Sequence, residues 1–197
     1  MNLFTEYTIG LLDSLKIEKA HVLGWSMGTN IALNLAINYP NRVNKLVLDA
    51  ADCGGKEAIL ASNEVIHALI NTSGTPEEQG MRFLRLMFPD KWLNENSSAW
   101  YCNYFTKSIE SSKTENIERQ AKAMLDWEGV CTKLLQIGQR TLLILGTEDV
   151  ITPPANSWMI AQKIPGAWLV QIRDGGHGLM YQYPEKSNRI IMTFLET

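Results

Sequence analysis

Residues 20–40 read A-H-V-L-G-W-S-M-G-T-N-I-A-L-N-L-A-I-N-Y-P. An apolar β-type run leads into an amphipathic helical run that stops at a proline. Between the two runs stands G-x-S-x-G, with Gly24 and Gly28 at the positions where a strand and the following helix crowd together. We predict that Ser26 lies at the apex of a sharp strand-to-helix turn and acts as a nucleophile. The alternative is an ordinary helix N-cap serine, which explains neither flanking glycine.

Two further motifs each follow an apolar run that reads as a strand. Residues 146–154 read G-T-E-D-V-I-T-P-P, and residues 174–185 read D-G-G-H-G-L-M-Y-Q-Y-P-E. Parallel strands end at one edge of their sheet, so Ser26, Asp149 and His177 are expected to leave the sheet on the same side. The chain order Ser, Asp, His is also that of a known class of serine hydrolase.

These motifs resemble the α/β-hydrolase superfamily, in particular the group with G-x-S-M-G elbows that includes esterases, carbon-carbon bond hydrolases and cofactor-free perhydrolases. The resemblance covers nearly the whole chain from Phe4 onward. It implies that His177 is the general base, that Asp149 orients the imidazole, and that the backbone N–H of Met27 is one oxyanion donor. It implies no metal and no organic cofactor.

Competing assignments remain for several of these residues. The acid could instead be Glu148, or Asp49 or Asp52 after the second strand, where some relatives place it. His21 and His67 are expected to be structural or surface histidines. We expect the substrate pocket to include Trp25 and Met180.

The periodicity predicts an α/β fold with a mostly parallel sheet of about four strands, a partial α/β-hydrolase fold. The first core part is 1–53, a helical cap insertion is 54–139, and the second core part is 140–197. Strands are predicted over 20–25, 45–48, 141–145 and 167–172, and core helices over 3–15, 27–39, 153–163 and after Pro184. Cap helices are predicted over 57–70, 76–87, 94–107 and 114–135.

Composition excludes several classes of function. The chain of 197 residues is 45% hydrophobic and 20% charged, with a formal net charge of -3 and no basic cluster. We therefore expect no nucleic-acid partner. No apolar run is long enough to span a bilayer, and the N-terminal residues lack the basic start of a leader, so we expect no membrane anchor.

The cysteine content bears on the compartment. Three cysteines, Cys53, Cys102 and Cys131, stand at wide spacing outside any motif. This pattern argues against a disulfide framework and against a zinc site, and we predict a cytoplasmic protein.

The sequence predicts a serine hydrolase that acts on small carboxylic esters or related acyl compounds. The alternatives are a carbon-carbon bond hydrolase or perhydrolase with the same triad, and a catalytically impaired fragment or interaction module. Relatives place three or four strands before the segment seen here, and an early loop there supplies the second oxyanion donor. We therefore expect ester turnover at least about a hundredfold below that of an intact relative. We also expect a second copy or a complementing N-terminal segment along the edge of strand 20–25.

Overall fold

A parallel sheet organises the chain in the computed structural model, which describes residues 1–96 and 114–197. Four strands lie in the order β1-β2-β3-β4, and each adjacent pair is parallel. The predicted fold class is confirmed. The strands are β1 Ala20–Trp25, β2 Val43–Asp49, β3 Arg140–Gly146 and β4 Trp168–Ile172.

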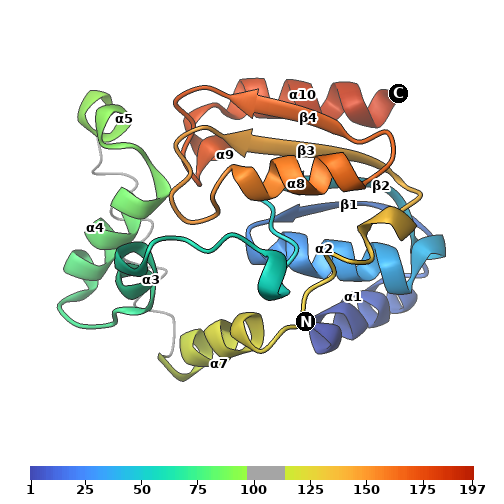
Figure 1. Cartoon of the computed structure of the whole chain (residues 1–197), viewed down its shortest axis with the longest axis horizontal. Coiled ribbons are helices and arrows are strands. Elements are labelled where there is room, and N and C mark those ends of the chain that lie inside the picture. The colour runs from blue at the N-terminus through green and yellow to red at the C-terminus, as the bar shows by residue number, and fades with distance from the viewer. Residues whose placement is uncertain (97–113) are drawn as a thin grey trace.

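Helices cover the two faces of this sheet (Figure 1). On one face α2 (Met27–Asn38) and α8 (Ala155–Lys163) bury the larger hydrophobic core, which includes Leu33, Leu46 and Ile160. On the other face α9 (Leu179–Gln182) and α10 (Pro184–Glu196) pack over a second core. β2 and β3 are buried almost throughout because both have a strand on each side and helices above and below.

The first helix lies within one residue of the predicted range 3–15 at each end. α1 (Asn2–Ser14) packs on α2 partly through polar groups, since the buried Asn34 amide donates to the Thr5 hydroxyl at 2.9 Å, while Ile9 packs against the larger core. The apolar stripe of the helix faces outward as a result. Its four members are between 57% and 68% exposed: Leu3, Tyr7, Leu11 and Leu15.

The inserted segment lies beyond the C-terminal ends of the strands (Figure 1). Its helices are α3 Asn63–Ile70, α4 Pro76–Met87, α5 Asp90–Glu95 and α7 Thr114–Leu125. Short 3-10 turns occur at Pro40–Arg42, Gly55–Glu57 and Leu134–Gln136. Within 54–96 and 114–139 the segment forms no strand. Most of the helix predicted over 94–107 falls outside the described residues.

Two predicted helix boundaries in this segment are wrong. The helix predicted to begin at residue 57 begins at Asn63, because the Ser62 hydroxyl accepts a hydrogen bond from the N–H of Val65 and caps it there. The helix predicted to reach residue 135 ends at Leu125. The chain then turns through Gly129, whose positive φ of 77° favours glycine.

The cysteine prediction is also wrong. Cys53, just after β2, and Cys131, just before β3, form a disulfide with a Cα–Cα distance of 5.1 Å. Both residues are buried, and the N–H of Val130 donates to the Cys53 carbonyl at 2.8 Å. The bond joins the two ends of the inserted segment, 78 residues apart, which sequence spacing did not indicate. A cytoplasmic location therefore loses the support that unpaired cysteines would have provided.

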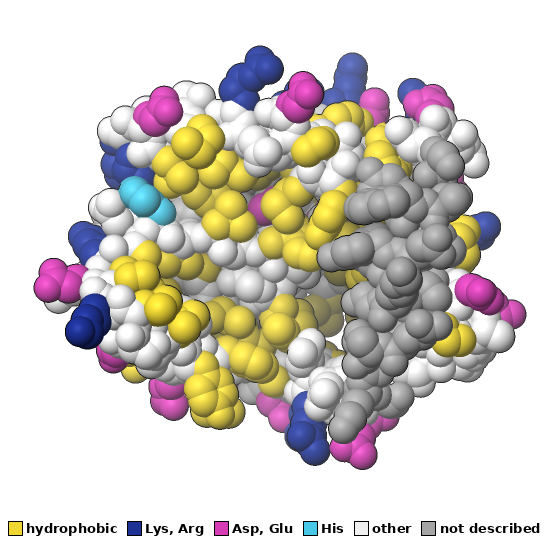
Figure 2. Space-filling view, turned by 180° about the vertical axis from the view of Figure 1, so that it is seen from behind, with side chains coloured by type: hydrophobic (Ala, Val, Ile, Leu, Met, Phe, Trp, Pro, Cys, Tyr) yellow, Lys and Arg dark blue, Asp and Glu magenta, His cyan; other side chains and the backbone are white. Residues whose placement is uncertain are grey.

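β1 is an edge strand of this sheet. Among the described strands its only partner is β2, and Leu23 at its centre is 47% exposed. Seen from behind, hydrophobic side chains are spread over much of the surface (Figure 2). An apolar edge of this kind offers unpaired backbone groups to another strand.

Candidate active site

The elbow is a strained turn between β1 and α2. Ser26 has φ 53° and ψ -126°, a backbone conformation that residues other than glycine rarely adopt. Its N–H donates to the Asp49 carbonyl at 3.0 Å, and its hydroxyl makes no capping hydrogen bond to α2. A Cβ on Gly24 would lie 2.4 Å from the Gly28 carbonyl oxygen, so the strand and the helix could not approach with a side chain there. The crowding predicted at Gly28 is wrong, because a Cβ there would meet nothing within 4 Å. The Ser26 side chain therefore projects from a strained turn and does not cap α2.

The predicted acid and base loops meet at the same end of the sheet. His177 Nδ1 lies 2.9 Å and 3.1 Å from the two carboxylate oxygens of Asp149, and both side chains are buried. The Asp149 carboxylate also accepts from the N–H groups of Ile151 and Thr152, at 2.9 Å and 2.8 Å. These bonds hold the carboxylate in one orientation toward the imidazole.

The Trp25 ring lies beside this pair, with its centroid 5.4 Å from that of the His177 ring. Trp25 directly precedes Ser26 in the chain, so the strand that carries the elbow contacts the imidazole through its last residue. Within the described part of the chain, the Ser26 hydroxyl and the His177 ring form no direct hydrogen bond, and the full triad stays a prediction.

Residues 4–184 match the family model of the alpha/beta hydrolase fold. The chain belongs to the α/β hydrolase fold family. This is a family of enzymes, and relatives of this chain include proteins named as hydrolases.

The hydrolase is similar to the 2-hydroxymuconate semialdehyde hydrolase of Pseudomonas putida, at 30% identity over 98% of this chain and 68% of that protein. It is 27% identical, over 95% of this chain and 69% of the relative, to a Caulobacter vibrioides protein provisionally named carbamate hydrolase RutD. A solved hydrolase from Pseudomonas aeruginosa PA01 superposes with a TM-score of 0.82 at 25% identity, over 98% of this chain and 71% of that one. The chain thus spans about 70% of the length of these proteins.

The other candidate acids of the hydrolase have different surroundings. Glu148 is exposed, and the Asp52 carboxylate accepts from the Asn30 amide and the Gly54 N–H. Of the candidate acids, Asp149 alone is hydrogen-bonded to the imidazole. His21 and His67 are both exposed, His21 at the start of β1 and His67 on α3.

Asp49 has surroundings that the sequence did not indicate. It is fully buried at the end of β2, and among the described residues neither carboxyl oxygen has a hydrogen-bond partner. Burial and then the negative charge of Asp149 raise the pKa of the Asp49 carboxyl from 3.8 to about 8, against the opposing effect of the Ala50 N–H. At neutral pH this group is therefore mostly a neutral acid beside the charged Asp149.

The two expected pocket residues lie in different places. Trp25 packs in a cluster with Leu84, Met87 and Phe88 of the inserted segment, over the C-terminal edge of the sheet. Met180 packs instead against the core between the sheet and α10. Met27 is the first residue of α2, where its N–H is not used within the helix.

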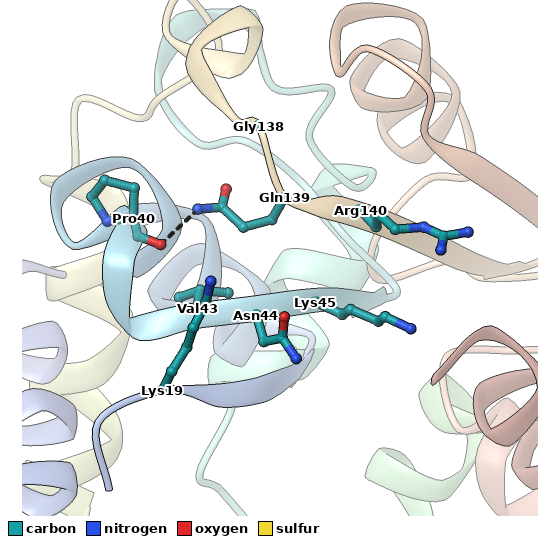
Figure 3. A pocket seen from close by; sticks show the side chains of 8 residues that line it. All are labelled: Lys19, Pro40, Val43, Asn44, Lys45, Gly138, Gln139 and Arg140. Atoms are coloured by element: carbon teal, nitrogen blue, oxygen red, sulfur yellow. Dashed lines mark hydrogen bonds between the residues drawn. The ribbon is translucent and has the colours of Figure 1, made fainter. Parts of the chain in front are cut away.

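A cavity of about 270 Å³ lies at the opposite end of the strands (Figure 3). The Lys45 ammonium donates to the carbonyls of Phe194 and Leu195, and Arg140 donates to Thr197, so neither cation is free to bind a ligand. In Figure 3 both side chains point away from Lys19. The cavity is therefore separate from the elbow, which lies at the other end of the strands.

Two absences hold for the described ranges, residues 1–96 and 114–197. These ranges contain no group of three or more His, Cys, Asp or Glu residues that could hold a metal ion. None of their helices is both long and apolar enough to cross a membrane.

Proposed function

We propose that this hydrolase cleaves small carboxylic esters through an acyl-enzyme on Ser26. The observation that carries the proposal is the buried Asp149–His177 pair at the same sheet edge as the strained serine turn. His177 Nδ1–H donates to the carboxylate, which leaves Nε2 unprotonated and able to accept a proton. A serine, a base and a group that orients the base are the parts that acyl transfer requires.

In the first half of the reaction, the Ser26 oxygen attacks the substrate carbonyl carbon while its proton moves to His177 Nε2. The carbonyl oxygen becomes an oxyanion, and the N–H of Met27, the first residue of α2, stabilises it in this proposal. Collapse of this intermediate expels the alcohol, which takes the proton from His177. Water then attacks the acyl-enzyme by the same route and releases the carboxylic acid.

A second candidate is hydrolysis of a carbon-carbon bond with the same residues. It is favoured by relatives named 2-hydroxymuconate semialdehyde hydrolase and 2-hydroxy-6-oxo-6-phenylhexa-2,4-dienoate hydrolase. Both names describe hydrolases of unsaturated oxo acids. Comparing turnover of a p-nitrophenyl ester with turnover of a 2-hydroxy-6-oxo-dienoate separates the two candidates.

The proposal is tested by labelling with a fluorophosphonate probe together with p-nitrophenyl acetate hydrolysis. We expect the wild-type chain to label, and Ser26→Ala to lose both labelling and hydrolysis. Ser14→Ala, at an exposed serine near the end of α1, is the matched control and should behave as wild type. A wild-type chain that neither labels nor hydrolyses would instead support an interaction module.

A further inference from the structure

The peptide unit between His177 and Gly178 is hydrogen-bonded on both sides. Its carbonyl accepts from Trp25 Nε1–H at 3.0 Å, and its N–H donates to the Met87 carbonyl at 2.8 Å. Trp25 ends β1, and Met87 ends α4 of the inserted segment. Two elements from distant parts of the chain thus hold the peptide that carries the imidazole.

Close packing supports the same arrangement. A Cβ on Gly178 would lie 2.5 Å from the Phe88 ring, and a Cβ on Gly176 would lie 2.6 Å from the Met87 carbonyl oxygen. Both glycines are therefore needed for the loop to approach the end of α4. Met87 and Phe88 are almost fully buried, at 0% and 1% exposure, so this contact is well shielded from water.

Trp25 is fixed by its own neighbours. Its ring packs at a tilt on His177 and edge-to-face on Tyr181, with a centroid distance of 6.2 Å to the latter. An indole held in this way donates its N–H in one direction, toward the His177 carbonyl. The imidazole itself is held at Nδ1 by Asp149. Rotation of the ring away from the elbow would require at least one of these bonds to break.

We propose that Trp25 is a positioning residue, whose indole N–H holds the His177 peptide so that the imidazole is aimed at Ser26. The Met87 carbonyl is the second half of this peptide clamp, which ties the placement of the base to α4. The inference rests on the proposed function, since it assigns His177 as the base. It differs from the expectation that Trp25 lines the substrate pocket, because the polar atom of the indole is committed to the loop.

Trp25→Phe tests the proposal, since phenylalanine keeps an aromatic ring in place and removes the N–H. The measurements are kcat and KM for p-nitrophenyl acetate, and the low-field proton NMR signal of His177 Nδ1–H. We expect kcat to fall about tenfold, KM to change less than about twofold, and the NMR signal to weaken through faster exchange. Trp168→Phe is the matched control, because Trp168 is 43% exposed at the start of β4 and packs edge-to-face on Phe194, at the end of the sheet opposite the elbow.

Wild-type values of kcat and of the NMR signal in Trp25→Phe would overturn the proposal. If Trp25→Phe fails to fold, replacing Trp25 by 3-benzothienylalanine keeps the two-ring shape and removes only the donor, with the same expected and contrary results. The NMR signal also separates failure of the proposed ester hydrolysis from failure of the clamp. A wild-type chain without ester turnover, whose low-field signal still depends on the Trp25 N–H, would contradict the proposed function and support the clamp.

Discussion

The buried carboxyl of Asp49 predicts that Asp49→Asn stabilises this hydrolase, and does so increasingly as the pH rises. In the folded chain this carboxyl stays protonated up to about pH 8, because burial and the charge of Asp149 oppose ionisation. In the unfolded chain it ionises near its ordinary pKa of 3.8. Asparagine has a similar shape and does not titrate, so the variant removes this difference between the two states.

The size of the effect follows from the pKa difference. Between pH 4 and pH 8 the folded state binds one more proton at Asp49 than the unfolded state, so the free energy of unfolding falls with rising pH. One pH unit corresponds to about 1.4 kcal/mol. The contribution of the Asp49 proton to the free energy of unfolding is therefore fully present below about pH 4 and is reduced by roughly 4 kcal/mol at pH 7. This contribution is lost completely as the pH passes about 8.

The assay is urea denaturation of wild type and Asp49→Asn at pH 5, 6, 7, 8 and 9. We expect the difference in the free energy of unfolding to grow by about 1.4 kcal/mol per pH unit up to pH 8 and then to level off. Asp126→Asn, at an exposed carboxylate paired with Lys122, should run parallel to wild type. A difference between wild type and Asp49→Asn that does not change with pH would refute the reasoning.

Three further predictions concern other parts of the chain. Cys53→Ser should lower the free energy of unfolding by about 4 kcal/mol, since the bond to Cys131 closes a long loop, and dithiothreitol should destabilise wild type but not this variant. Gly24→Ala should abolish fluorophosphonate labelling because its Cβ would overlap the next helix, whereas Gly28→Ala, with nothing within 4 Å, should still label. If β1 pairs with a second copy, the wild type should sediment as a dimer. Leu23→Lys places a charge on that strand and should sediment as a monomer. A monomeric wild type would contradict such pairing.

The sequence by itself determined the fold class and most of its elements. Strand 20–25 and helix 76–87 were predicted with the bounds they have, because alternation, caps and prolines act over a few residues. The placement of Asp149 and His177 at one edge was also predictable. Parallel strands place their C-terminal loops together whatever lies between them in the chain.

The tertiary structure alone decided which groups meet across long separations. No local pattern indicates that Cys53 pairs with Cys131, or that the apolar stripe of α1 faces outward while its polar side packs on α2. The burial of Asp49 beside Asp149 and the hydrogen bond from the Gly178 N–H to the Met87 carbonyl also join groups that are far apart in the sequence. The close approach of Gly176 and Gly178 to the end of α4 was likewise not predicted. Local periodicity specifies each element, whereas burial, charge coupling and hydrogen bonds between elements arise only when they pack together.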